Sequence, residues 1–530
     1  MQPKKDNDTQ PQDSTTNKAE QPTTRTSQQN TTSSPPQSSR MKSCSLVMLA
    51  LLASTAAAQL ANFGVQPNTW NSSLTLSTQQ IRDAQLTDEI AKSVEVATNS
   101  DRSQLAYGGP SEDDFYTLPP LTNTTGPLQP GVVLKTQLVT DTSGFSIPPN
   151  TALSRFMYTT TTLNGTVVPT TAFVLWPFEP RQFGQTNSSH VAAPTVLWTH
   201  GTSGFHSDAA PSAMRHLWYG FSTPFALAQD GYALVGPDYA GLGIDKSWDG
   251  SHIAHQWDVA QVGARDALYA LQAAWDAFPG RLTEEFVSMG HSQGGGVAWG
   301  VTERLALSED EFPVKTFGGY KGAVAGSPVV DVFGVSPAFI SNFVGIAMSS
   351  IFPDFTLDLW LTPLGVARNK LWTSIKGGIG AAQQLFLTAE VTRENYTEQS
   401  WHAAAFEKLA NPGRKDFKGP LLVLQGTEDV YVPYNGVKST VEDTCALFPN
   451  HDLEFLVVNG TGHVPTLDAT RPRWLRWIQD RFEDKPVRQT GCYTSHLHSW
   501  LPHEQYLAVG GSVIQWVAGP KFNYQAILGL

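Results

Sequence analysis

Charged side chains are scarce in this chain of 530 residues, and the few that occur favour the negative sign. Asp, Glu, Lys and Arg make up 15 % of the residues, and the formal net charge is −12 with a pI near 5.5. Nucleic-acid binders neutralise phosphates with Lys and Arg, so this balance argues against a nucleic-acid partner. The hydrophobic content of 40 % suits one large globular domain with attachments.

Long apolar runs are also missing. None reaches the roughly 18 residues that a membrane span needs, so we expect no transmembrane segment. Residues 1–40 hold almost nothing apolar and predict a disordered, low-complexity segment. Residues 41–58 have an early lysine, a short apolar core and a run of small residues, the form of a secretory signal. Because signals belong at the N-terminus, we expect Met41 to be the true start. A cytoplasmic tail with a signal anchor is the alternative.

Cysteine is rare, with only three residues, Cys44, Cys445 and Cys492. Cys44 leaves with the signal, so the remaining two predict a single Cys445–Cys492 disulfide in an oxidising compartment. Together with the signal, this indicates a secreted, extracellular protein. Sequons for N-glycosylation after the signal mark six candidate acceptors, Asn71, Asn123, Asn164, Asn187, Asn395 and Asn459.

Extended apolar runs alternate with helical patterns along much of the chain. Amphipathic helices are expected at residues 258–277 and 471–482, the second with a proline in its first turn. Strands that alternate with helices predict an α/β fold, a mostly parallel sheet with helices on both faces. The expected strands are residues 132–139, 171–177, 194–201, 232–238, 285–290, 320–327, 420–426 and 453–460.

The organisation predicted from this pattern has a core in two parts, residues 119–330 and 411–482. Residues 59–118 form an N-terminal extension and residues 483–530 a C-terminal tail. Between the core parts, residues 331–410 include an apolar stretch that Pro337, Pro353 and Pro363 divide into several short helices. Because helices apolar on most sides must be covered, we expect a cap over the active site. Core helices of an extended domain are the alternative.

The stretch VSMGHSQGGG, Val287–Gly296, places one hydroxyl among many glycines. An expected strand ends at Gly290, Ser292 follows, and a helix begins after it. Gly-x-Ser-x-Gly between a strand and a helix is the pattern of a nucleophile elbow, in which small neighbours permit a strained turn that presents the serine. The alternative is an ordinary glycine-rich helix start.

A serine nucleophile needs a base, and the base needs an acid that orients it. In this fold both follow the serine along the chain. The run LLVLQGTEDVYVP offers Asp429 just past a strand, with Glu428 as the alternative acid. After one more strand, VVNGTGHVP supplies His463 as the base, where a solvent-exposed loop histidine is the alternative interpretation.

The tetrahedral intermediate of such a reaction carries an oxyanion, which needs two aimed N–H donors. We expect one from the backbone of Gln293, the residue after the nucleophile. The loop after an earlier strand, THGTSG, offers the N–H of Thr202, with Gly201 as second choice.

Other histidines raise the question of a metal. His252 and His255 lie close in sequence, as do His496, His498 and His503. A zinc site needs three or four converging ligands with a supporting shell, and the sequence shows no complete set. We therefore expect no metal and no cofactor.

Taken together, the signal, HGTSG followed by Ala209–Ser212, GYALVGPDYAGLG, GHSQGG, GTEDVYVP and GTGHVP resemble the fungal and bacterial secretory lipases, the group typified by yeast lipase A. The resemblance spans Pro119 to Phe482. It implies an α/β-hydrolase fold, hydrolysis of carboxylic esters, a helical cap and no metal, with Ser292, Asp429 and His463 in the triad positions. Some members carry a cysteine where this chain has Ala209, so that disulfide is absent here.

The sequence thus predicts a serine hydrolase that cleaves carboxylic esters of medium or long acyl chains through an acyl-enzyme. The apolar cap predicts an ester or lipid substrate and transient contact with a lipid interface. An acyltransferase or peptidase with the same triad is one alternative, and an inactive secreted protein on this fold is another. The sequence leaves the oligomeric state open.

Overall fold

The computed structural model describes residues 73–121, 127–184, 192–307, 310–335, 338–394 and 400–506. The expected disordered segment, the signal peptide and Cys44 lie outside the described residues. So do four of the six sequons, Asn71, Asn123, Asn187 and Asn395. The other two asparagines, Asn164 and Asn459, are both exposed, in the turn that follows Thr161 and directly after Val458.

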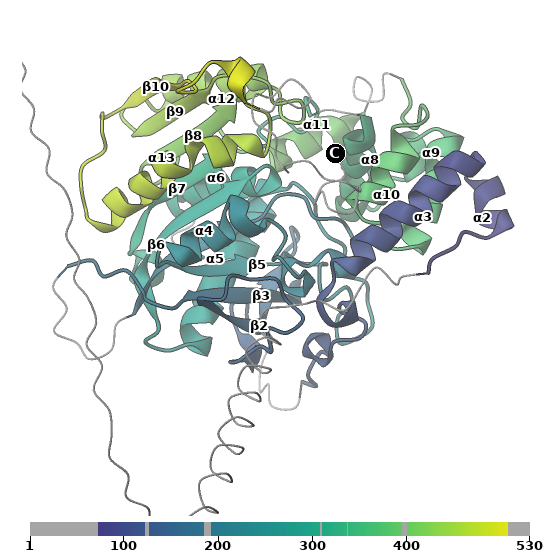
Figure 1. The fold of residues 1–530 in the computed structure, drawn as a ribbon, viewed down its shortest axis with the longest axis horizontal. Coiled ribbons are helices and arrows are strands. Elements are labelled where there is room, and N and C mark those ends of the chain that lie inside the picture. The colour runs from purple at the N-terminus through teal and green to yellow at the C-terminus, as the bar shows by residue number, and fades with distance from the viewer. Residues whose placement is uncertain are drawn as a thin grey trace, which may run out of the picture. The chain divides into compact units, whose positions relative to one another are not determined.

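The described strands form a ten-stranded sheet in the order β1-β2-β3-β5-β4-β6-β7-β8-β9-β10 (Figure 1). In this sheet order, the neighbours β1, β2, β3 and β5 pair antiparallel. Every later pair, from β5 with β4 to β9 with β10, is parallel. The sheet is therefore mostly parallel, as predicted. The strands are β1 Val133–Gln137, β2 Thr151–Thr161, β3 Val167–Pro177, β4 Ala193–Thr199, β5 Ala233–Pro237, β6 Leu282–His291, β7 Tyr320–Gly326, β8 Leu421–Gly426, β9 Leu453–Val458 and β10 Cys492–Leu497.

The central strands owe their position to continuous apolar sequence. Every residue of β4, β5 and β8 is buried, which is the pattern of parallel strands covered on both faces. By contrast, β10 is only half-buried along its length, which fits its place at the edge of the sheet.

Helices cover both faces of the sheet. Helices α5, Ala260–Ala277, and α6, Gln293–Leu307, pack against each other and the central strands, and α12, Tyr434–Leu447, shares an apolar cluster with α6. Helix α4, Pro224–Gln229, packs on β3 and β5, and α13, Pro465–Phe482, packs on β6 to β9. One boundary prediction was wrong: α13 starts at Pro465, so Pro472 lies inside the helix and not in its first turn.

Four of the described α-helices are inserted between β7 and β8 and are called the cap helices below. They are α8 Ala338–Ile351, α9 Pro363–Ser374, α10 Ile379–Phe386 and α11 Trp401–Ala410. The N-terminal helices α2, Thr78–Asp83, and α3, Asp88–Ser103, pack on α9 and α10, as the purple ribbon beside the green helices shows (Figure 1). Hydrogen bonds from Arg102 to the Ile375 carbonyl, 3.0 Å, and from Arg368 to the Ala84 carbonyl, 3.2 Å, fasten this contact. Helices α2 and α3 of the N-terminal extension are therefore part of the cap layer.

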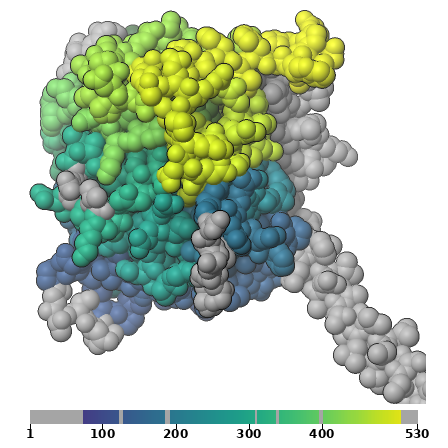
Figure 2. All heavy atoms as spheres, turned by 90° about the vertical axis from the view of Figure 1, so that its left-hand side faces the viewer, coloured from purple at the N-terminus to yellow at the C-terminus, as the bar shows by residue number. Residues whose placement is uncertain are grey.

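The C-terminal segment returns to the sheet. After α13 the chain forms β10, which lies parallel to β9 over six residue pairs, and Cys492 at its start is bonded to Cys445 of α12. The predicted disulfide is present. In Figure 2 this segment, in yellow, gathers over the upper part of the face shown. The remaining short elements are helix α7 Val314–Phe317 and the 3-10 turns Ala106–Gly108, Asp114–Tyr116, Ser207–Ala209, Pro211–Ala213, Gly220–Ser222, Leu357–Leu359 and His503–Gln505.

Candidate active site

Ser292 sits on the sharp turn between β6 and α6. Its φ is +60°, in the left-handed region that a residue with a side chain adopts only under strain. Hydrogen bonds hold this conformation: the Ser292 N–H donates to the Gly326 carbonyl at 2.9 Å, and the Ser292 carbonyl accepts from Gly296 at 3.0 Å and Val329 at 3.2 Å. Ser292 is thus held in a strained turn by hydrogen bonds with β7, with the segment after β7 and with α6. This is the geometry of a nucleophile elbow.

Two glycines make this turn possible. A Cβ added to Gly290 would collide with the Gly294 carbonyl, and a Cβ added to Gly294 would collide with the Thr199 and His200 carbonyls. These obstacles are backbone atoms of the end of β4, of His200 after it and of the elbow itself, so they cannot move aside as a side chain could. The glycines in the pattern are therefore required by the close approach of the elbow to β4.

His463 and Asp429 form a hydrogen-bonded pair. His463 Nδ1 lies 2.8 Å from Asp429 Oδ2, and both residues are buried. The Asp429 Oδ1 atom accepts from the N–H groups of Tyr431, 3.0 Å, and Val432, 2.9 Å. The Asp429 Oδ2 atom also accepts from the Gln425 side chain at 3.2 Å. Four donors around one carboxylate fix its orientation toward His463.

The alternative acid has a different environment. Glu428 is exposed, and its carboxylate accepts a hydrogen bond of 3.4 Å from its neighbour Thr427. The structure therefore brings Asp429, and not Glu428, to His463.

The predicted oxyanion donors come from two segments, the start of α6 and the loop after β4. Gln293 is the first residue of α6, so its N–H is one of the four at a helix start that have no acceptor within the helix. Thr202 follows β4 and lines the same cavity as Ser292. Its hydroxyl accepts a hydrogen bond of 2.8 Å from Trp257, which fixes the Thr202 loop. A Cβ on Gly201 would collide with the Tyr219 hydroxyl and lie 3.0 Å from the His291 carbonyl, so this loop also depends on a glycine.

Ser292 and His463 open into one cavity of about 70 Å³, called the serine cavity below. Most of its other walls are apolar or aromatic, with Val329, Val335, Ile340, Phe343, Ile379 and Trp257 among them. Three of these residues, Ile340, Phe343 and Ile379, belong to cap helices. The cap helices therefore supply part of the apolar wall of the serine cavity.

Sequence reasoning missed a buried histidine beside the serine. His291 Nδ1 lies 2.7 Å from the Tyr219 hydroxyl, and its Nε2 lies 3.2 Å from the His463 carbonyl. Burial, and then the neighbouring His463, hold the pKa of His291 well below the usual value of 6.5. His291 is therefore neutral, and its contact with the His463 carbonyl stabilises the loop that carries His463. Its position between Gly290 and Ser292 was the available signal, but its partners come from distant segments.

A second group of buried rings supports Gln293. The rings of His200 and His255 lie on Tyr239 at centroid distances of 4.3 and 5.9 Å, and His255 Nε2 lies 3.2 Å from the Gln293 amide nitrogen. Burial lowers the pKa of His200 to about 4 and that of His255 to about 3, so both rings are neutral near pH 7. His255 thus packs inside the protein as a hydrogen-bonding partner of the elbow.

The other histidines considered as metal ligands do not converge. His252 is exposed, with its Nδ1 3.0 Å from the Asp245 carbonyl. His496 on the edge strand β10 and His498 just after it stack at a centroid distance of 6.4 Å, and His503 lies in the turn beyond them. Within the described ranges, no group of three or more His, Cys, Asp or Glu side chains is placed to hold a metal ion.

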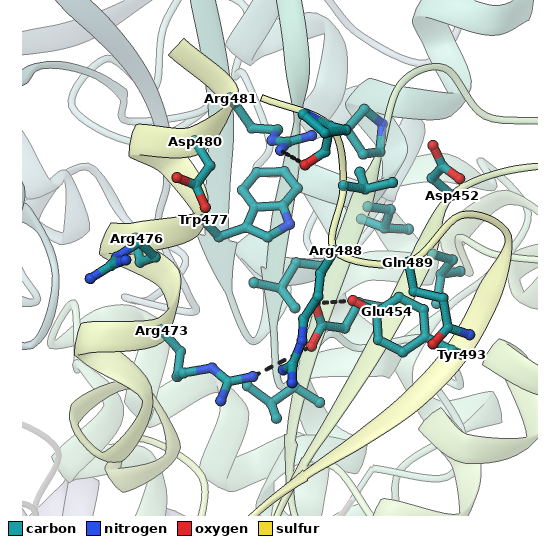
Figure 3. A pocket seen from close by; sticks show the side chains of 17 residues that line it. Asp452, Glu454, Arg473, Arg476, Trp477, Asp480, Arg481, Arg488, Gln489 and Tyr493 are labelled. Atoms are coloured by element: carbon teal, nitrogen blue, oxygen red, sulfur yellow. Dashed lines mark hydrogen bonds and ion pairs between the residues drawn. The ribbon is translucent and has the colours of Figure 1, made fainter. Parts of the chain in front are cut away.

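A separate hollow of about 420 Å³ lies between α13, β9 and the loop before β10 (Figure 3). Charged side chains surround it: Arg473 lies 3.8 Å from Glu454, which also accepts from Tyr493 at 2.7 Å. It shares no lining residue with the serine cavity. The two hollows are therefore different sites.

Comparison with known proteins assigns the family. Residues 196–475 match the model of the alpha/beta hydrolase family, which covers more than half of the chain. The protein is therefore a member of the alpha/beta hydrolase family. A comparison with curated protein sequences finds no significant match.

Solved structures share the fold at low sequence identity. Candida antarctica lipase A superposes with a TM-score of 0.56 and 16 % identity, over 73 % of this chain and 90 % of that one. The closed state of the same lipase superposes with a TM-score of 0.53 and 18 % identity, over 72 % of this chain and 88 % of that one. The rice cell wall degrading esterase LipA from Xanthomonas oryzae superposes with a TM-score of 0.46 and 17 % identity, over 67 % of this chain and 99 % of that one. The family match and the two Candida antarctica lipase A structures confirm the predicted α/β-hydrolase fold, with helices inserted after the nucleophile-bearing half.

Proposed function

We propose that this protein is a serine hydrolase that cleaves carboxylic esters, with Ser292 as nucleophile, His463 as base and Asp429 as the acid that orients it. One observation carries the proposal. A strained serine on a glycine-bounded elbow shares an apolar cavity with a histidine whose other nitrogen is bonded to a buried carboxylate. That arrangement activates a hydroxyl for attack on an acyl carbon.

The proposed chemistry follows from these positions. His463 accepts the proton of Ser292 as the serine oxygen attacks the ester carbonyl. Asp429 stabilises the imidazolium that forms. The N–H groups of Thr202 and Gln293 are proposed to receive the oxyanion, and the start of α6 adds a favourable field for negative charge. Loss of the alcohol leaves an acyl-enzyme, which water then hydrolyses by the same steps.

Matched carboxylate variants test the assignment. Ser292→Ala and His463→Ala should each reduce turnover by several orders of magnitude without loss of folding. Asp429→Asn should also be severe, because a misoriented imidazole cannot accept the proton. Glu428→Gln is the control, since that side chain is exposed and away from His463. Full activity in Asp429→Asn together with loss in Glu428→Gln would overturn the acid assignment.

A fluorophosphonate probe separates an active enzyme from an inactive member of the fold. We expect the probe to label the protein at Ser292 and to fail on Ser292→Ala. An unlabelled wild-type protein would support the inactive alternative. Product analysis with added alcohols or amines then distinguishes a hydrolase from an acyltransferase or peptidase.

The serine cavity supports a preference for medium or long acyl chains. Each buried methylene contributes about 0.8 kcal/mol, and the cavity wall offers valine, isoleucine and aromatic side chains. A volume of about 70 Å³ holds only a few water-sized groups, so we propose that the cap helices move to admit the chain. A kcat/KM series from acetyl to dodecanoyl esters should rise with chain length. Acetyl and butyryl esters that outpace octanoyl esters would refute the acyl preference while leaving ester hydrolysis in place.

We also propose that the protein is secreted and glycosylated, and that the cap makes transient contact with a lipid interface. The Cys445–Cys492 bond and the exposed side chains of Asn164 and Asn459 support export through an oxidising compartment. Among the described helices, none combines the length and apolarity that crossing a bilayer requires. Mass spectrometry of the protein from culture medium, before and after removal of N-glycans, tests both points.

A further inference from the structure

A short run of strained backbone carries a tyrosine into the serine cavity. Leu217 has a φ of +51°, Trp218 of +70° and Gly220 of +52°, so within this run only Tyr219 lies outside the left-handed region. Bulky side chains disfavour that region, and such strain persists where the surrounding structure requires it, often at functional sites. Tyr219 itself lines the serine cavity.

The Tyr219 side chain is fixed against the loop that follows β4. The residue is 5 % exposed, and its ring packs edge-on against Trp198 of β4 at a centroid distance of 5.3 Å. Its hydroxyl accepts a hydrogen bond from the N–H of Gly201, and a Cβ added to Gly201 would collide with the same oxygen. The strained run therefore holds a phenol directly against this loop.

The direction of the next hydrogen bond follows from His291. Its Nε2 faces the His463 carbonyl, which only accepts, so Nε2 carries the proton. A neutral imidazole has one N–H, so the Nδ1 of the neutral His291 is an acceptor. The Tyr219 O–H therefore donates to His291 Nδ1 over 2.7 Å, and its oxygen keeps lone pairs for the Gly201 N–H. One chain of hydrogen bonds thus runs from Gly201 through Tyr219 and His291 to His463.

This chain bears on the proposed oxyanion hole. Because the Gly201 N–H is bonded to Tyr219, the N–H of Thr202 is favoured over it as the donor from this loop. Two side chains then anchor the loop: Tyr219 holds Gly201, and Trp257 donates to the Thr202 hydroxyl at 2.8 Å. Oxyanion donors are effective because they are oriented before the charge develops, so an anchor of the loop contributes to their effect.

We propose that Tyr219 is a positioning residue of the oxyanion hole, whose hydroxyl ties the Gly201–Thr202 loop to His291. Since His291 directly precedes Ser292 and contacts the His463 carbonyl, the same chain holds the loop in register with the nucleophile and the base. The inference rests on the proposed ester hydrolysis and adds a residue to its machinery. The Tyr219 O–H is committed to His291, so this residue acts through the loop and does not donate to the oxyanion.

A matched pair of tyrosine variants tests the proposal. Tyr219→Phe keeps the ring and removes the hydroxyl. For an octanoyl ester, kcat should fall roughly ten- to hundredfold with KM nearly unchanged, a smaller loss than that of a whole oxyanion donor. Tyr158→Phe is the control, because Tyr158 is also buried and donates to the Asp266 carbonyl at 2.8 Å, but it does not line the serine cavity. Each variant loses a buried hydrogen bond and should show a lower Tm, and only Tyr219→Phe should show a lower kcat.

Two ketones distinguish positioning from contact with the substrate. Octyl trifluoromethyl ketone adds to the serine hydroxyl and forms an oxyanion, whereas octyl methyl ketone binds without this addition. In Tyr219→Phe, the inhibition constant of the trifluoromethyl ketone should rise by the factor by which kcat/KM falls, and that of the methyl ketone should not change.

A second variant breaks the same link from the other side. His291→Gln keeps an N–H for the His463 carbonyl and removes the ring nitrogen that accepts from Tyr219. The double variant should be no worse than Tyr219→Phe alone, since both changes remove the same hydrogen bond. Additive losses would show that Tyr219 acts without His291 and would overturn the proposed chain.

The inference and the proposed function fail in different ways. A wild-type enzyme that does not hydrolyse the octanoyl ester and is not labelled at Ser292 by a fluorophosphonate overturns both. An active wild type with an unchanged kcat in Tyr219→Phe, measured per labelled active site, overturns the inference alone. Equal loss of affinity for the two ketones also overturns it, because Tyr219 would then act on the bound ground state and not on the oxyanion.

Discussion

Loss of the Cys445–Cys492 bond should destabilise the protein by an amount that the chain length between the two cysteines sets. The sequence separation is 47 residues. In the chain-entropy model, a cross-link over such a loop lowers the entropy of the unfolded chain by about 14 cal/mol/K, which is about 4 kcal/mol at 25 °C. The perturbation is the double variant Cys445→Ser/Cys492→Ser, which removes the bond without leaving a free thiol.

The architecture around the bond makes this loss measurable. Among the described strands, β10 pairs with β9 alone, and its residues are half-buried or exposed, so packing contributes little to its attachment. Unfolding entropy of roughly 2.1 cal/mol/K per residue over about 410 described residues converts 4 kcal/mol to a decrease in Tm of about 5 °C. Urea unfolding at equilibrium gives the free energy directly.

The assay compares wild type, the double variant and wild type with reductant. A change in unfolding free energy below about 1 kcal/mol in the double variant would refute the entropic reasoning, since the loop length is the same in any environment. A thiol assay on the unfolded, unreduced protein without residues 1–58 provides the control. Two titratable thiols there would show that the bond does not form.

Two further predictions concern the elbow and a buried carboxyl. Gly294→Ala should abolish activity and lower Tm, because the added Cβ meets the Thr199 and His200 carbonyls; Gly436→Ala, whose Cβ has only Asp331 Cβ at 3.9 Å, is the control and should be neutral or stabilising. Equal behaviour of the two variants would contradict the steric account. Burial raises the pKa of Asp266 from 3.8 to about 7, although hydrogen bonds from Thr160 and Ala240 act in the opposite direction and lower it. Between pH 4 and 7, Asp266 is therefore protonated in the native state and ionised in the unfolded chain. The unfolding free energy of wild type minus that of Asp266→Asn should decline by a few kcal/mol as the pH rises over this range. A difference that does not change with pH would contradict the raised pKa of Asp266.

The parts of the fold that the sequence predicts are those that local constraints determine. The central strands are continuous apolar runs, and the elbow needs glycines at fixed positions, so both are visible without a structure. Strand β2 was not among the expected strands, because its second half, Tyr158–Thr161, is rich in threonine and is buried by helix α5, which the local sequence does not reveal. Strand β10 was also missed, since an edge strand of alternating exposure carries little apolar signal.

The candidate site divides in the same way. The positions of Ser292 and Asp429 follow from the strand that each one succeeds, and His463 follows from chain order. The supporting residues could not be predicted, because their roles depend on contacts across long distances in sequence. His291 meets Tyr219, 72 residues away in the chain, and Arg102 bonds to the carbonyl of Ile375, 273 residues away. A periodic pattern in the sequence does not predict contacts between residues so far apart in the chain.

The place at which the cap helices leave the sheet has a consequence for how this protein varies over evolution. Strands β7 and β8 are hydrogen-bonded neighbours with Gly326 opposite Leu424, although the whole cap is inserted between them. The entropy of closing a loop grows only with the logarithm of its length, by about 0.6 kcal/mol for each doubling. Lineages can therefore lengthen, shorten or replace the cap with almost no penalty to the sheet, while Ser292 after β6 and Asp429 after β8 keep their places. Substrate range can diverge quickly in such a protein, and the chemistry slowly.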